Sequence, residues 1–182
     1  MTSPEINIDP TIAGSVVGTY WFLMMIGRLC GASIGAKVSS RAMLTVVSTV
    51  GIVLVLGAIF CADNILVNMP VFKSDISFGF AQVPVNVMLL ILCGLCTSVM
   101  WGGIFNLAVE GLGKYTAAAS GLFMVMVCGG GILPLIQGGV ADFAGFLNSY
   151  WVIALGLAYI LFYAAIGSKN VNTDIPTDDY EA

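Results

Sequence analysis

Five long apolar segments constrain this chain more than any other feature of its sequence. We place them at residues 12–36, 42–61, 86–109, 116–140 and 146–167, and only the first contains a charged residue, Arg28. A helix needs roughly 20 apolar residues to cross the hydrocarbon core of a bilayer. The segments are continuous and do not alternate between polar and apolar residues, so they predict helices and not strands. The sequence therefore predicts an all-α membrane protein with five transmembrane helices.

The composition agrees with this prediction and excludes several kinds of function. Of the 182 residues, 59% are hydrophobic and 9% are charged, whereas a soluble domain is about 25% charged. The chain has no histidine, which excludes Ser-His-Asp catalysis and histidine-ligated metal sites. No pair of acids and no nucleophile–base pair lies within an apolar segment. We therefore expect no enzyme, no metal, no cofactor and no nucleic-acid partner.

The polar segments between the apolar ones predict the orientation of the chain. The flank 1–11 and the loops 62–85 and 142–148 share one side of the membrane, where Lys73 is the only basic residue. The basic residues of the other side are Lys37, Arg41, Lys114 and Lys169. Basic residues favour the cytoplasmic side. We therefore expect an external flank at 1–11, a membrane region at 12–167 and an acidic cytoplasmic tail at 168–182.

Small residues indicate the faces by which the segments pack. Gly27 and Gly31 lie one helical turn apart in the first segment, and the third segment has a similar stripe that includes Gly94 and Ser98. Lipid provides no hydrophobic drive for helix association, so close approach of backbones at small residues must replace it. We expect the first, third and fourth segments to surround a common space, and the second and fifth to face lipid.

The fourth segment contains a predicted bend. Gly129, Gly130 and Gly131 come shortly before Pro134. Proline lacks a backbone donor and crowds the preceding turn of a helix, and glycines next to it give little resistance to bending. We therefore expect a bend near the middle of the membrane at these residues.

Arg28 requires a polar environment inside the membrane. An arginine at the centre of a transmembrane helix costs about 2.5–3.5 kcal/mol on insertion scales. Tyr20, Trp21 and Met24 share its helical face. Two interpretations remain open: Arg28 serves a function inside the bundle, or it is structural and pairs with backbone carbonyls or extends to the cytoplasmic side.

Two further groups of polar residues have a functional and a structural interpretation. Lys37, Arg41 and Glu110 lie in two turns on the same predicted side, where they could form a charged latch or remain solvated loop charges of small energetic value. Asn106 and Gln137 are amides within the third and fourth segments. Each could hydrogen-bond a hydroxylated ligand or bridge two helices, which is the commoner use.

Two stretches of the sequence carry a family resemblance. The first extends from Tyr20 to Gly31 and contains G-R-L-C-G at 27–31. The second extends from Ile104 to Asp142 and contains E-G-L-G-K-Y-T at 110–116, S-G-L at 120–122 and G-G-G-I-L-P-L-I-Q-G at 129–138. Together they resemble the fucose–galactose–glucose:proton symporter family, the L-fucose permease-like family of the major facilitator superfamily. M-W-G-G at 100–103 departs from an F-P-T-like segment expected there, which leaves the sugar open.

The resemblance implies a fold of twelve helices in two halves, of which these segments would be the last five. Residues 1–11 would then be the external loop after the seventh helix, and the preceding seven helices are expected partners. It implies a partial sugar transporter in the bacterial inner membrane, taking up fucose, glucose or galactose with a proton or sodium ion. Its cavity candidates would be Tyr20, Arg28, Asn106 and Gln137. The alternative is a truncated membrane protein that does not transport or that serves as an assembly partner.

Overall fold

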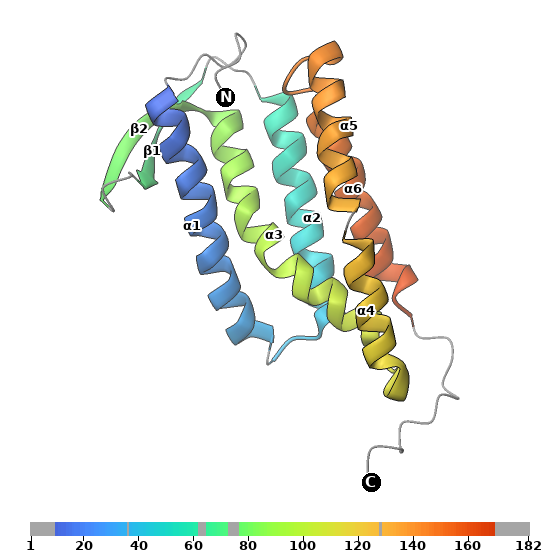
Figure 1. Cartoon of the computed structure of the whole chain (residues 1–182). Coiled ribbons are helices and arrows are strands. Elements are labelled where there is room, and N and C mark those ends of the chain that lie inside the picture. Colours follow the sequence, from blue (N-terminus) through green and yellow to red (C-terminus); the bar gives the residue numbers. More distant parts are fainter. Residues whose placement is uncertain (1–9, 36, 62–64, 73–76, 128, 170–182) are drawn as a thin grey trace.

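Six α-helices and one β-hairpin account for most of the described residues (Figure 1). The structure is a computed structural model that describes residues 10–35, 37–61, 65–72, 77–127 and 129–169. The helices are α1 (Pro10–Gly35), α2 (Ser40–Phe60), α3 (Val85–Val109), α4 (Thr116–Met126), α5 (Gly129–Ala144) and α6 (Tyr150–Phe162). A 3₁₀ turn at Gly113–Tyr115 precedes α4, and a π turn at Tyr163–Gly167 extends α6.

Five stretches are long and apolar enough to cross a membrane. They are Ile12–Gly35, Ser40–Phe60, Val85–Val109, Gly113–Ala144 and Tyr150–Gly167. This confirms the all-α fold class with five transmembrane helices, and α4 and α5 together make up the fourth. Nearly all of the predicted external flank and of the acidic tail, and Lys73, lie outside the described residues.

Helix α3 lies at the centre of the bundle and packs against α1 and α2. The contact with α1 is as close as the glycine pattern predicts, because a methyl group at Gly27 would collide with Ser98, and one at Gly31 with Val99. On α3 itself, a methyl group at Gly94 would lie 2.9 Å from a ring carbon of Tyr20. Glycine therefore sets the distance between α1 and α3.

Helices α2 and α6 contribute to the core, so the expectation that the second and fifth segments simply face lipid is wrong. Helix α2 lies between α3 and α6, and Leu44, Val55 and Ala58 are buried there. A methyl group at Gly51 would already be in ordinary contact with Leu157 of α6 and Met100 of α3. A small residue in the middle of α2 thus lets two helices pack against it.

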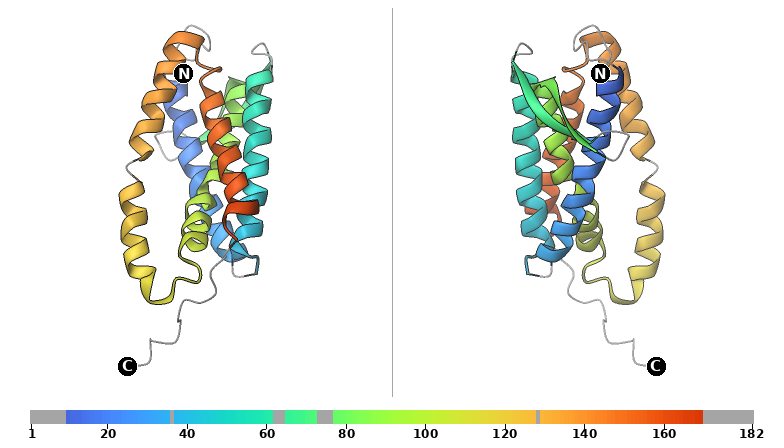
Figure 2. Two further views of the ribbon diagram at one scale, coloured as in Figure 1. Left: turned by 90° about the vertical axis from the view of Figure 1, so that its right-hand side faces the viewer. Right: turned by 90° about the vertical axis from the view of Figure 1, so that its left-hand side faces the viewer.

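The fourth span is interrupted and loosely packed. Helix α4 ends at Met126 and α5 begins at Gly129. The interruption therefore comes directly before the residues where the bend is expected, and Pro134 lies within α5. The described residues of α4 and α5 include no buried side chain, and a methyl group at Gly130 or Gly131 would meet nothing within 4 Å. Figure 2 shows the α4 part of this span standing apart from the other helices.

A β-hairpin occupies most of the region where the sequence analysis expects a loop. Strand β1 (Leu66–Phe72) pairs antiparallel with β2 (Phe78–Pro84), so that Leu66 is opposite Pro84 and Phe72 is opposite Phe78. One face of the hairpin packs against α1 and α3 and buries Met69, Val71 and Val83. The backbone N–H of Phe72 also donates to Thr19 Oγ1 of α1 at 2.8 Å.

Candidate functional site

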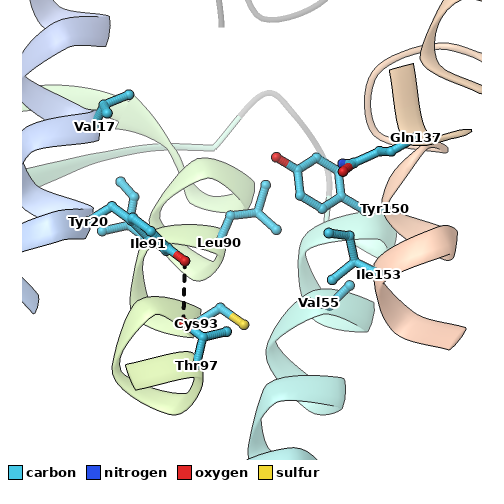
Figure 3. Close-up of a pocket in the computed structure, with 10 residues that line it drawn as sticks. All are labelled: Val17, Tyr20, Val55, Leu90, Ile91, Cys93, Thr97, Gln137, Tyr150 and Ile153. Carbon is cyan, nitrogen blue, oxygen red and sulfur yellow. Dashed lines mark hydrogen bonds between the residues drawn. The ribbon is translucent and has the colours of Figure 1, made fainter. Parts of the chain in front are cut away.

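The first candidate site is a pocket between the helices near the end where α1 and α3 begin (Figure 3). Its volume is about 330 Å³. Helices α1, α2, α3, α5 and α6 all contribute to its wall, which consists of Val17, Tyr20, Val55, Leu90, Ile91, Cys93, Thr97, Gln137, Tyr150 and Ile153. A mostly apolar wall with a few polar groups is typical of small-molecule sites.

The polar groups of this pocket lie on two opposing sides. Figure 3 shows Tyr20 and Thr97 on one side and Gln137 and Tyr150 on the other. The hydroxyls of Tyr20 and Thr97 lie 3.3 Å apart. The Thr97 hydroxyl also donates to the carbonyl of Gly94 at 3.2 Å, so Tyr20 supplies the proton in the bond between them. Two of the residues proposed from the sequence, Tyr20 and Gln137, are therefore brought to one cavity.

Arg28 and Asn106 line a second pocket of about 340 Å³ between α1, α2 and α3. Glycines form much of its wall, and its lining contains no carboxylate. The Arg28 side chain is exposed, and its Nη2 lies 3.9 Å from the sulfur of Met24. No described residue of α4 or α5 lines this pocket.

Arg41 forms its hydrogen bonds with Ser168 at the end of the last span. Its Nε donates to Ser168 Oγ at 3.2 Å, and its Nη2 donates to the Ser168 carbonyl at 2.8 Å. Carbonyls at a helix end lack partners within the helix and attract cations, which makes Ser168 a good partner for a guanidinium. Arg41 and Glu110 do line one pocket of about 600 Å³. Among the described residues, no hydrogen bond or ion pair joins Glu110 to Arg41 or Lys37, and the charged latch stays a prediction.

Three residues at these sites are absent from the sequence-based candidates. Thr97 and Tyr150 face the first pocket, and Ser168 holds Arg41. Thr97 is a hydroxyl in the middle of a mostly apolar helix, and this position is a weak signal in the sequence. Ser168 comes just before Lys169 at the end of the last span, and nothing in the sequence indicates which loop it meets.

The relatives found among known proteins match this chain over different lengths. The chain is 30% identical over 169 residues to the glucose/galactose transporter of Brucella abortus, a match that covers 89% of this chain and 36% of the relative. It is 33% identical over 92 residues to the L-fucose-proton symporter of Escherichia coli, which covers 50% of this chain and 21% of the relative. The chain thus spans just over a third of the length of the first relative. No family model and no solved structure matches.

Proposed function

Because the chain belongs to the fucose–galactose–glucose symporter family of the major facilitator superfamily, we propose that it forms part of a secondary active sugar transporter. The similarity to a glucose/galactose transporter over 89% of the chain carries this proposal. The relatives are transporters and symporters, and the chain is not an enzyme. The proposed substrate is a monosaccharide, either glucose, galactose or fucose. The proposed coupling ion is a proton, with sodium as the alternative.

The proposed architecture assigns the five spans to the last five helices of a twelve-helix transporter. Seven further helices would complete the pathway, and rocking of one half against the other would expose the sugar to each side in turn. The first pocket supports a role in sugar contact, since Tyr20, Thr97, Gln137 and Tyr150 supply hydroxyl and amide groups within an apolar wall. We assign Arg28 and Asn106 to a second polar position along the same route.

The proposed location is the bacterial inner membrane, with the C-terminus in the cytoplasm. The excess of basic residues in the turns at 37–41 and 110–115 and after 167 supports this orientation. Thiol labelling of intact cells tests it in a background without the native cysteines. An impermeant reagent should label Ile65→Cys, which is exposed at the end of the hairpin far from its tip, and leave Lys169→Cys unlabelled. The reverse pattern would overturn the orientation.

Uptake of labelled sugar in proteoliposomes tests the function. The chain by itself should not accumulate glucose, galactose or fucose, because it supplies only one side of a two-sided pathway. A chimera should accumulate at least one of these sugars when an inward proton gradient is applied. That chimera joins the chain to the portion of the Brucella abortus relative that precedes the matched region. A folded, monodisperse chimera without uptake would favour the alternative of a non-transporting membrane protein.

A further inference from the structure

The β-hairpin extends to a depth at which membrane proteins rarely expose strands. The ring of Phe22 in α1 stacks on Phe72 at the tip of the hairpin, with centroids 5.3 Å apart and planes within 3°. The ring of Phe78 lies 5.5 Å from the same Phe22 ring. Phe22 comes ten residues after Ile12, where the first span begins, and this distance is about 15 Å at the helical rise of 1.5 Å per residue. The tip therefore lies well inside a hydrocarbon layer about 30 Å thick.

Lipid tails cannot hydrogen-bond the backbone groups at the open edges of this two-stranded sheet. Within the described part of the chain the sheet has two strands, β1 and β2, so each strand has an outer edge whose backbone groups pair with no other described strand. In hydrocarbon such groups find no hydrogen-bond partner, and non-helical backbone at membrane depth occurs only where it is covered by protein or faces water.

The outward face of the hairpin combines amides with aromatic rings. The strand register places Asn68 opposite Gln82 and Pro70 opposite Phe80 on this face. Phe80 is 80% exposed and Phe78 is 66% exposed, while Asn68 and Gln82 are exposed as well. Two neighbouring amides need hydrogen-bond partners, which lipid tails lack.

This face is separate from the two pockets already described. Thr19, which holds the hairpin to α1, is nine residues before Arg28, and nine residues correspond to two and a half helical turns. The hairpin and the Arg28 side chain therefore lie on opposite faces of α1. No residue of the hairpin lines either pocket.

We propose that the hairpin is a re-entrant element whose outward face lines a water-filled entrance at the end of the bundle where α1 begins. This entrance wall consists of Asn68, Pro70, Phe78, Phe80 and Gln82. Water satisfies the open strand edges and the two amides, while the aromatic rings offer flat surfaces to a dissolved solute. The identification of this solute as a sugar rests on the proposed function. The contact between the outward face and water is independent of that function.

The reactivity of cysteines on the hairpin tests this proposal. The protein, in a background without native cysteines, is reconstituted in liposomes with a negatively charged methanethiosulfonate on both sides, so the result is independent of orientation and of transport. Phe80→Cys and Gln82→Cys are compared with Val53→Cys on α2, which is 64% exposed on the surface of a spanning helix. Val83→Cys, on the buried face of the hairpin, measures the background.

The expected result is that both outward variants react at least about tenfold faster than Val53→Cys, because the reactive thiolate forms only where water reaches the sulfur. Val83→Cys should react as slowly as Val53→Cys. If Phe80→Cys and Gln82→Cys react as slowly as Val53→Cys, water does not reach the outward face, and lipid or protein covers it. That result overturns the proposal, and two outward variants ensure that one misfolded protein does not decide it.

Discussion

The contact between α1 and α3 and the span formed by α4 and α5 are both rich in glycine, yet they pack in opposite ways. At Gly27 and Gly31, the glycines let two helices approach so closely that an added methyl group would collide with the neighbour. At Gly130 and Gly131, an added methyl group would meet nothing within 4 Å. A stripe of small residues therefore permits close packing, but a second helix must be present to use it.

The difference between these regions agrees with the proposal that further helices complete the transporter. The face of the fourth span carries large apolar side chains that this chain leaves exposed, such as Leu135 and Ile132. Helices α1, α2, α3 and α6 by contrast form a continuous series of contacts, from α1 to α3, from α3 to α2 and from α2 to α6. We infer that these four helices fold as one unit. The fourth span would gain most of its contacts from the further helices that complete the transporter.

The largest contrast is expected between a leucine of the core and a leucine of the fourth span. Leu44 of α2 is buried, whereas Leu135 of α5 is 78% exposed. Leu44→Ala should lower the free energy of unfolding by about 2–5 kcal/mol because it leaves a cavity. Leu135→Ala should change it by less than about 0.5 kcal/mol. Reversible unfolding in mixed micelles measures both, and equal losses would remove the distinction between the regions.

A methyl group added to a glycine should give the next largest contrast. Gly27→Ala forces α1 away from Ser98 and should cost about 1–3 kcal/mol of unfolding free energy. Gly131→Ala has free space around it and should be neutral or stabilising by up to about 1 kcal/mol, because alanine loses less backbone freedom on folding. The same unfolding measurement applies. A harmless Gly27→Ala would mean that α1 and α3 do not approach as described.

Replacing Arg28 by lysine should reduce transport more than stability. Lysine keeps the charge but loses the planar donor fork of arginine, and losing one charge-assisted hydrogen bond corresponds to roughly a tenfold loss of uptake. Uptake per folded chimera is the measurement, with Lys169→Arg as a charge-conserving control outside the spans. Unchanged uptake by Arg28→Lys would leave Arg28 with a structural role only.

The smallest effect is expected at the two basic residues that flank the start of α2. Arg41→Gln removes the hydrogen bonds to Ser168 and should cost about 1 kcal/mol of unfolding free energy. Lys37→Gln, at an exposed position in the same turn, should cost less than about 0.5 kcal/mol. If Lys37→Gln destabilised the protein more than Arg41→Gln, the contact between Arg41 and Ser168 would not be the one that holds this end.

Sequence reasoning located the five spans and the α1–α3 contact because length, apolarity and glycine spacing are local properties. It missed the hairpin, although β1 and β2 alternate between inward residues such as Val71 and outward residues such as Phe80. Polar residues and two prolines within 62–85 favour a loop when the segment is taken by itself. The hairpin forms because α1 and α3 offer an apolar surface to one of its faces.

The sequence provides candidate residues for a site, but it does not predict which residues they contact. Tyr20 and Gln137 line one pocket, and Arg28 and Asn106 line another. The sequence analysis assigns all four residues to a single cavity. Arg41 illustrates why partners are harder to predict. A charged partner, Glu110, is the natural expectation from sequence, whereas the fold brings the uncharged Ser168 within 2.8 Å through its carbonyl. Backbone partners depend on where helices end in space, which spacing along the chain does not reveal.

The mobility of a spin label on α5 tests most directly whether helices beyond this chain cover the fourth span. A nitroxide is attached at Leu135→Cys, and at Val53→Cys on α2 as the control, both exposed in this chain. Spectra of the chain alone are compared with those of the chimera that contains the additional helices. We predict that the label at position 135 becomes strongly immobilised in the chimera while the label at position 53 does not change. Equal mobility at position 135 in both proteins would contradict the account.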